Sequence, residues 1–224
     1  MTRTPHAFYE EPDEPLKRRR FIEYKTGFIE PLFPTDTSIR ITDLACGYGL
    51  FLDACRRLGY RHVEGIEAGE TFVRYAHDTL GITGIARGDL FGYLESKADG
   101  YFDVITAFNI VEHIKKERVQ ELLDLIYQKL KRGGIFIMEV PNADSPLGVH
   151  TYFTDLTHEF AFSRTLALRL FQIAGFADVK VRYQPNLRNP LIKLAQKILA
   201  KVVGLPYEAM FSGNIILVGH RSRA

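Results

Sequence analysis

Apolar and polar residues follow two periodicities along the chain, and each predicts one kind of element. Short runs rich in Ile and Val indicate buried strands, whereas apolar residues three or four positions apart indicate amphipathic helices. The clearest helix begins at Val119, carries Lys131 and Arg132 in its last turn and is expected to end at Gly133. Another helix is expected from Ser163, as its N-cap, to Gly175. Strands are predicted over residues 38–45, 62–68, 82–89, 101–109, 134–142, 177–185 and 213–221.

Helical spacing over residues 51–58 and 72–80 places helices between the first strands. This alternation predicts an α/β fold: a Rossmann-like, doubly wound, seven-stranded sheet, mostly parallel with an antiparallel edge strand, and with helices on both faces. We expect a single domain over residues 1–224. Its parts are expected to be an N-terminal cap (1–36), a cofactor-binding core (37–145), a substrate loop (146–163) and a helical insertion (186–207).

Composition narrows the class of protein. Of the 224 residues, 46% are hydrophobic, which suits one substantial core, and the formal charge of only +2 gives no reason to expect a nucleic-acid partner. Cys46 and Cys55 form no Cys-x-x-Cys pair. The chain shows no signal-peptide pattern and no apolar run of membrane-spanning length. These observations predict a soluble, cytoplasmic protein.

The stretch "DLACGYGLFL", residues 43–52, carries the strongest motif. Gly47 and Gly49 follow a predicted strand at the spacing of a nucleotide-binding turn, where glycine lets the backbone approach a ligand closely. A dinucleotide fingerprint requires a third glycine, and Leu52 stands there instead, which argues against a pyrophosphate. No Lys-Ser or Lys-Thr follows, so the motif is not a P-loop.

Two acids narrow the ligand further. Glu67 ends the second predicted strand, where a carboxylate can accept hydrogen bonds from both hydroxyls of a ribose. Asp89 ends the third predicted strand and could accept from an adenine amino group. Each acid has a plainer interpretation, as a turn residue or an exposed strand end. A ribose and an adenine without a pyrophosphate describe S-adenosylmethionine.

With "EGIEAG", "GDL" and "FDVITAFNIVEHI", the glycine motif resembles the class I S-adenosylmethionine-dependent methyltransferases over about residues 39–140. The family commonly has Asp where this chain has Glu67. The resemblance implies that S-adenosylmethionine is the cofactor and assigns the residues around it. Asp43, Ala45, Gly47 and Gly49 would surround the methionine part, Glu67 and Ala68 the ribose, and Asp89 and Leu90 the adenine, while Asn109 would use its backbone.

Methyl transfer to a hydroxyl needs alignment of the acceptor and removal of a proton, for which histidine is suited. His113, next to Glu112, follows the fourth predicted strand, and His158 lies with Asp155 after the fifth. We expect one of these histidines to be the base. Alternatively, His113 is a helix-start residue that orders the loop beside the cofactor, and His158 is a hydrogen-bonding strut to Asp155 or a backbone carbonyl. No metal is expected, because the ligand spacing is not diagnostic. The expected substrate residues are His150, Tyr152, Phe153 and Glu159.

The segment "HTYFTDLTHEFAFS" resembles methyltransferases of bacterial surface-glycan and sugar-nucleotide pathways. More distantly, "EHI" is shared with the ubiquinone-type O-methyltransferases. This resemblance implies O-methylation of a small molecule: a sugar, a nucleotide sugar or a glycan precursor. An amine acceptor, and hence N-methylation, remains an alternative.

The segment 190–204 is predicted to be a helix with an apolar face and a stripe formed by Lys193, Lys197 and Lys201. It is expected to pack on the domain or on a second copy in a homodimer, with weak contact with an anionic membrane surface as the alternative. Two other classes of function stay open: an NAD-dependent dehydrogenase, against which Leu52 speaks, and a non-catalytic methyltransferase-like protein.

Overall fold

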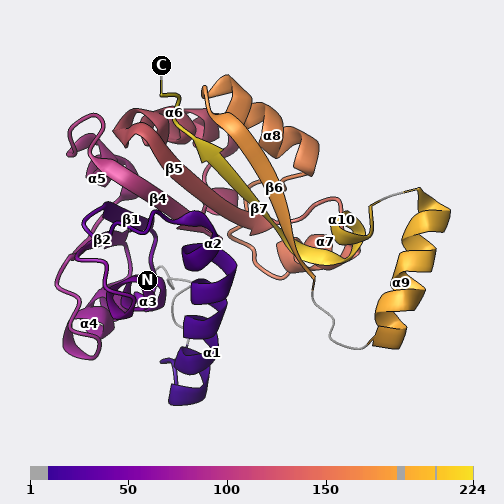
Figure 1. Ribbon diagram of the computed structural model, residues 1–224, viewed down its shortest axis with the longest axis horizontal. Coiled ribbons are helices and arrows are strands. Elements are labelled where there is room, and N and C mark those ends of the chain that lie inside the picture. The colour runs from indigo at the N-terminus through magenta and orange to yellow at the C-terminus, as the bar shows by residue number, and fades with distance from the viewer. Residues whose placement is uncertain (1–9, 186–189, 205, 224) are drawn as a thin grey trace. The chain divides into compact units, whose positions relative to one another are not determined.

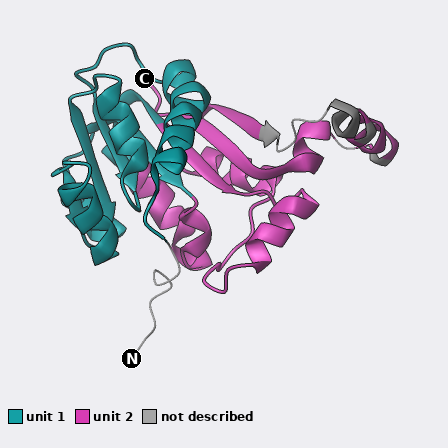
Figure 2. Cartoon of the chain, turned by 90° about the horizontal axis from the view of Figure 1, so that it is seen from below, with its two compact units in different colours: residues 1–108, 128–135 teal, residues 109–127, 136–224 magenta. Residues whose placement is uncertain are grey.

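The computed structural model describes residues 10–185, 190–204 and 206–223. Residues 1–9 of the expected N-terminal cap (1–36) therefore lie outside the described residues. So do residues 186–189 and 205 of the expected insertion (186–207). The chain divides into two compact units, drawn in teal and magenta in Figure 2. Unit 1 comprises residues 1–108 and 128–135, and unit 2 comprises residues 109–127 and 136–224.

Seven strands form one sheet in the order β3-β2-β1-β4-β5-β7-β6. The pairs β1–β2, β1–β4 and β2–β3 are parallel, and the edge pair β6–β7 is antiparallel (Figure 1). The predicted fold class is therefore confirmed. The strands are β1 (Arg40–Leu44), β2 (His62–Glu67), β3 (Ile85–Arg87), β4 (Phe102–Phe108), β5 (Leu130–Pro141), β6 (Ala177–Pro185) and β7 (Ser212–His220).

The described N-terminal segment of unit 1 is helical. Asp13 caps the first helix by accepting a hydrogen bond from the backbone N–H of Leu16 at 2.8 Å. A cluster of aromatic rings, Tyr24, Phe51 and Phe108, joins this helical segment to the helix after β1 and to the end of β4. The helical elements are α1 (Glu14–Tyr24), a π-helical turn η2 (Lys25–Ile29), α2 (Glu30–Leu32), α3 (Leu50–Arg57), α4 (Glu70–Asp78) and α5 (Leu90–Glu95).

Most helices of unit 2 follow the sequence pattern, and Ser163 and Gly175 bound α8 as expected. The expected loop over 146–163 is partly wrong, because residues 146–153 form helix α7. Its signals are local: Ser145 caps the helix and Pro146 occupies the first turn. The helical elements are η3 (Val111–His113), η4 (Lys116–Arg118), α6 (Val119–Lys129), α7 (Pro146–Phe153), α8 (Arg164–Ile173), α9 (Pro190–Val203) and α10 (Tyr207–Phe211).

The end of α6 also differs from the expectation. The helix ends at Lys129 rather than at Gly133, and β5 begins at the next residue. The carbonyl of Gln128 accepts a hydrogen bond from the N–H of Gly100 at 3.0 Å. A donor from a distant loop thus pairs with one of the carbonyls that a helix end leaves unpaired. The local sequence pattern cannot predict this hydrogen bond.

No helix among the described residues is both long enough and apolar enough to cross a membrane.

Candidate functional site

The turn after β1 in unit 1 has the geometry of a ligand-binding loop. Ala45, Gly47 and Gly49 have φ angles of 54°, 53° and 76°, so three positions within five residues are left-handed. For Ala45 this conformation is strained, and such strain gathers at functional sites. A Cβ atom on Gly47 would meet nothing within 4 Å, whereas one on Gly49 would lie 2.9 Å from Cδ1 of Ile85. Gly47 therefore faces open space, and Gly49 faces the core.

Glu67 forms hydrogen bonds with both the glycine turn and the turn that follows β2. Its Oε2 accepts a hydrogen bond from the N–H of Gly47 at 2.9 Å, and its Oε1 accepts one from the N–H of Gly69 at 2.8 Å. The side chain is only 5% exposed. Two bonds occupy half of the roughly four acceptor positions of a carboxylate, so the group can still accept from a ligand. The structure thus adds a positioning role to the expected contact with a ribose.

Asp43 is buried in the sheet. Its Oδ1 accepts a hydrogen bond from the hydroxyl of Thr106 at 2.6 Å, and the two residues are direct partners in the β1–β4 register. Burial raises the pKa of Asp43 to about 7, the bond from Thr106 opposes that rise, and the charge of Glu67 adds to it. Asp43 is therefore held by the neighbouring strand β4, and the sequence did not single out its partner Thr106.

Three further expected cofactor residues lie after β2 and β3. Asp89 is the N-cap of α5, where its Oδ2 accepts a hydrogen bond from the N–H of Gly92 at 2.9 Å. Leu90 is the first residue of that helix, and Ala68 is exposed directly after β2. These residues lie at the ends of neighbouring strands of unit 1, as the sequence predicted. One oxygen of Asp89 is used in capping α5.

Asn109, the first residue of unit 2, has a φ of 52°. Its N–H donates to the carbonyl of Glu139 at 2.8 Å, and its Oδ1 accepts a hydrogen bond from Nδ2 of Asn214 at 3.3 Å. Asparagine tolerates the left-handed region better than most residues. Asn109 is thus a second non-glycine residue in that conformation directly after a strand.

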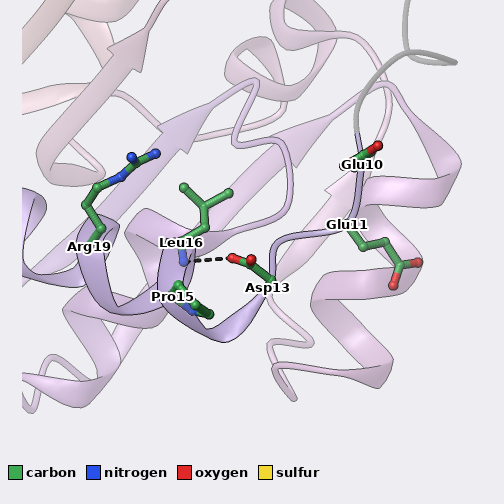
Figure 3. Close-up of a pocket in the computed structure, with 6 residues that line it drawn as sticks. All are labelled: Glu10, Glu11, Asp13, Pro15, Leu16 and Arg19. Carbon is green, nitrogen blue, oxygen red and sulfur yellow. Dashed lines mark hydrogen bonds between the residues drawn. The ribbon is translucent and has the colours of Figure 1, made fainter.

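The N-terminal segment lies beside the glycine turn. The hydroxyl of Tyr75 donates to the carbonyl of Pro12 at 3.4 Å, and its ring meets the ring of Tyr48 at 4.9 Å. Burial raises the pKa of Tyr48, and the charge of Glu11 adds to that rise. A pocket of about 490 Å³ lies at this segment. Figure 3 shows the residues that line it. Its lining residues are Glu10, Glu11, Asp13, Pro15, Leu16 and Arg19.

Unit 2 brings the two expected histidines together. The ring centroids of His113 and His158 are 4.6 Å apart. Backbone bonds hold the two segments: the N–H groups of Glu159 and Phe160 donate to the carbonyl of Glu112, at 2.8 and 3.3 Å. Nδ1 of His158 lies 2.7 Å from the carbonyl oxygen of Tyr152, and the two rings stack. A carbonyl can only accept, so Nδ1 carries the proton and Nε2 has the lone pair.

His113 is oriented through Thr157. Its Nδ1 lies 2.8 Å from Oγ1 of Thr157, whose hydroxyl donates to Oδ1 of Asp155 at 2.7 Å. The threonine proton is thereby used, so His113 donates from Nδ1 and has its lone pair on Nε2. Burial lowers the pKa of His113, and the nearby His158 lowers it further. The Asp-x-Thr pattern predicts a local turn but not this contact, so sequence reasoning missed Thr157.

Glu112 completes the cluster of unit 2. Its side chain is 1% exposed, and its Oε2 has no hydrogen-bond partner among the described residues. Burial raises the pKa of Glu112 to about 8, and the charges of Glu139 and Asp155 contribute to the rise.

The expected substrate residues differ in their contacts with this cluster. Tyr152 is half-buried and stacks on His158, and Phe153, at 77% exposure, stands next to it on α7. Glu159 has an exposed side chain and contacts Glu112 through its backbone. His150 is exposed on α7. Among these residues, Tyr152 thus has the most direct contact with the histidine pair.

A family model described as a methyltransferase domain matches residues 16–181, which is more than half of the chain. The chain belongs to this methyltransferase family. Together, the family and the class I fold make it an S-adenosylmethionine-dependent methyltransferase. No curated protein sequence matches this methyltransferase significantly.

Solved structures share the fold of this methyltransferase at low identity. A SAM-dependent methyltransferase from Archaeoglobus fulgidus is 22% identical, with a TM-score of 0.73 and coverage of 91% of this chain and 94% of that one. A possible histamine N-methyltransferase from Thermotoga maritima is 18% identical (TM-score 0.63, coverage 92% and 89%). Phosphoethanolamine N-methyltransferase 2 from Haemonchus contortus, solved with phosphomonomethylethanolamine and S-adenosylhomocysteine, is 16% identical (TM-score 0.63, coverage 91% and 52%).

Proposed function

We propose that this methyltransferase acts on a hydroxyl oxygen of a small molecule, and that the acceptor is a sugar, a nucleotide sugar or a glycan precursor. The observation that carries the O-methylation is the pair His113 and His158. The Nδ1 proton of each ring is held by an oxygen, so Nε2 of each is the basic nitrogen. Because burial lowers the pKa of His113, its imidazole is neutral at pH 7 and can accept a proton.

In the proposed reaction, one of these imidazoles takes the hydroxyl proton while the acceptor oxygen attacks the methyl carbon of S-adenosylmethionine. A C–O bond would form and the C–S bond would break. The electron pair of the C–S bond would remain on the sulfur of the product S-adenosylhomocysteine, and the imidazolium would later pass its proton to water. Asp155 acts through Thr157 to orient His113.

The proposed cofactor contacts follow the geometry of the strand ends. Asp43, Ala45, Gly47 and Gly49 would surround the methionine part, which the open space at Gly47 supports. Glu67 would accept from the ribose hydroxyls beside Ala68, and Asp89 and Leu90 would flank the adenine. Asn109 would contribute backbone atoms. The described part of the N-terminal cap (1–36) would cover the cofactor core (37–145) at the glycine turn, which the contact between Tyr75 and Pro12 supports.

The proposed acceptor pocket involves the segment 146–163. Tyr152 and Phe153 offer aromatic surfaces on which an apolar sugar face could stack, and His150 and Glu159 offer hydrogen bonds to hydroxyls.

Substitution of the two histidines tests the assignment of the base. We expect His113→Ala or His158→Ala to lower turnover by about 10²–10⁴-fold, because general-base catalysis contributes that much, while the affinity for S-adenosylhomocysteine stays unchanged. The measurements are turnover, with nucleotide sugars tried first as acceptors, and calorimetric titration. His62→Ala, an exposed position at the start of β2, is the matched control. Full turnover in both variants would contradict the assignment, and cofactor binding without turnover on any acceptor would favour a non-catalytic role.

An amine acceptor is the second candidate, and the N-methyltransferases among the similar structures favour considering it. The same imidazoles would then remove a proton from an ammonium group. A parallel screen of amines and nucleotide sugars separates the two candidate acceptors. Only the true acceptor class should give S-adenosylhomocysteine, and the rate of its formation should fall when His113 or His158 is substituted.

We propose a cytoplasmic location and a weak membrane-surface contact through residues 190–204. Leu194, Ile198 and Val202 are 57%, 58% and 79% exposed at positions i, i+4 and i+8 of α9, and Lys197 and Lys201 are exposed beside them. We expect co-sedimentation with phosphatidylserine-rich vesicles, reduced by Ile198→Glu and absent with neutral vesicles. If the protein stays in the supernatant and sediments as a dimer in solution, a second copy covers this face instead.

A further inference from the structure

We propose that Glu112, His113 and His158 form a binding site for a divalent transition cation of the Zn²⁺ type. One potential ligand atom of each residue, a carboxylate oxygen or a ring nitrogen, lies within 4.8 Å of those of the other two. Two imidazoles and one carboxylate are the protein ligands of one class of catalytic zinc site, which keeps a further position open for water or substrate. The sequence predicts no metal here, because the spacing of the candidate ligands is not diagnostic.

Glu112 is the residue that points to a cation. Native proteins normally pair buried carboxylate oxygens, yet Oε2 of Glu112 is buried without a hydrogen-bond partner among the described residues. A cation would satisfy that oxygen. Two further acids, Glu139 and Asp155, act electrostatically on Glu112, so the charges around the cluster favour a positive ligand.

The hydrogen bonds of the two imidazoles are those expected of metal ligands. Metal-binding histidines usually donate their second N–H to a carbonyl, a carboxylate or a water, which fixes the ring and leaves the other nitrogen for the metal. His158 uses Nδ1 for the carbonyl of Tyr152, and His113 uses Nδ1 for Thr157, which in turn donates to Asp155. Both histidines are half-buried, so the cluster is open to solvent.

A cation at this cluster changes how the proton of the acceptor is removed. The imidazoles then act as ligands, and a hydroxyl bound at the open position loses its proton more readily because the cation stabilises the oxyanion. Cation binding itself does not rest on the proposed methyl transfer, and it is measured without S-adenosylmethionine or acceptor.

The test is a calorimetric titration of the metal-stripped, tag-free full chain with Zn²⁺, together with the visible absorption of the Co²⁺-loaded protein. We expect one Zn²⁺ per chain with micromolar or tighter affinity, and Co²⁺ bands of a site with nitrogen and oxygen ligands. Glu112→Gln and His158→Asn should each weaken Zn²⁺ binding at least tenfold. At the same concentration, Zn²⁺ should also raise the Tm of the wild type more than that of Glu112→Gln, because stabilisation by a ligand grows with its affinity for the folded form.

Glu117→Gln is the matched control, because Glu117 is an exposed acid of η4, close in sequence to Glu112 and outside the proposed site. It should bind Zn²⁺ as the wild type does. The proposal is overturned if the wild type does not bind Zn²⁺, or if Glu112→Gln and His158→Asn bind it as tightly as the wild type. Circular dichroism shows which variants fold, and His113→Asn replaces any that does not.

Discussion

Glu67→Gln should lose both stability and cofactor affinity, although it changes only one atom of the side chain. Each carboxylate oxygen of Glu67 accepts a backbone N–H, one from Gly47 and one from Gly69. The amide of Gln keeps one acceptor and turns its NH₂ towards the other N–H, so two donors face each other in a buried place. Hydrogen bonds to charged groups contribute about 1.5–3 kcal/mol each, and we expect the free energy of unfolding to fall by about 2–3 kcal/mol.

The affinity of Glu67→Gln for S-adenosylhomocysteine should fall at least about tenfold, because the glycine turn loses its anchor and a ribose loses a charged acceptor. Denaturant titration and calorimetry measure the two effects. Glu70→Gln is the control: Glu70 pairs with Arg87 at 2.8 Å, but both side chains are more than half exposed, so stability should change by less than about 1 kcal/mol. Wild-type stability and affinity in Glu67→Gln would contradict the positioning role.

Alanine at Gly49 should mainly lower stability, whereas alanine at Gly47 should mainly lower cofactor affinity. At Gly49 the new Cβ would lie 2.9 Å from Ile85 and 3.3 Å from Ala76, at a φ of +76°. Overpacking costs about 1–3 kcal/mol and the left-handed conformation about 1–2 kcal/mol, so Gly49→Ala should lower the free energy of unfolding by about 2–5 kcal/mol. At Gly47 only the conformational cost applies, because its Cβ would meet nothing within 4 Å.

Gly47→Ala should instead weaken S-adenosylhomocysteine binding, because the methyl group would enter the space that we assign to the ligand. The two variants serve as each other's controls in denaturant titration and calorimetry. Equal losses of stability would show that the packing at Gly49 is not limiting. Unchanged affinity in a folded Gly47→Ala would place the cofactor elsewhere.

The sequence by itself determined the fold class and the places where ligand residues could lie. Short β-rich runs indicated the strands, and the 3.6-residue period indicated most helices, because burial imposes these patterns on the residues. The sequence also indicated a sharp turn at Gly47 and Gly49, since glycine adopts left-handed backbone conformations without strain. Where a helix end is satisfied by a distant group, as at Gln128, the local pattern failed.

Only the tertiary structure decided which atoms these residues offer to a ligand. Both oxygens of Glu67 hold backbone N–H groups, Asp43 is paired with Thr106, and one oxygen of Asp89 caps a helix. Likewise, the contact between residues 112–113 and 158 depends on backbone bonds between segments far apart in the chain. A sequence pattern records which face of an element is buried, but hydrogen bonds between elements depend on distances that exist only after folding, and these determine the chemistry of the site.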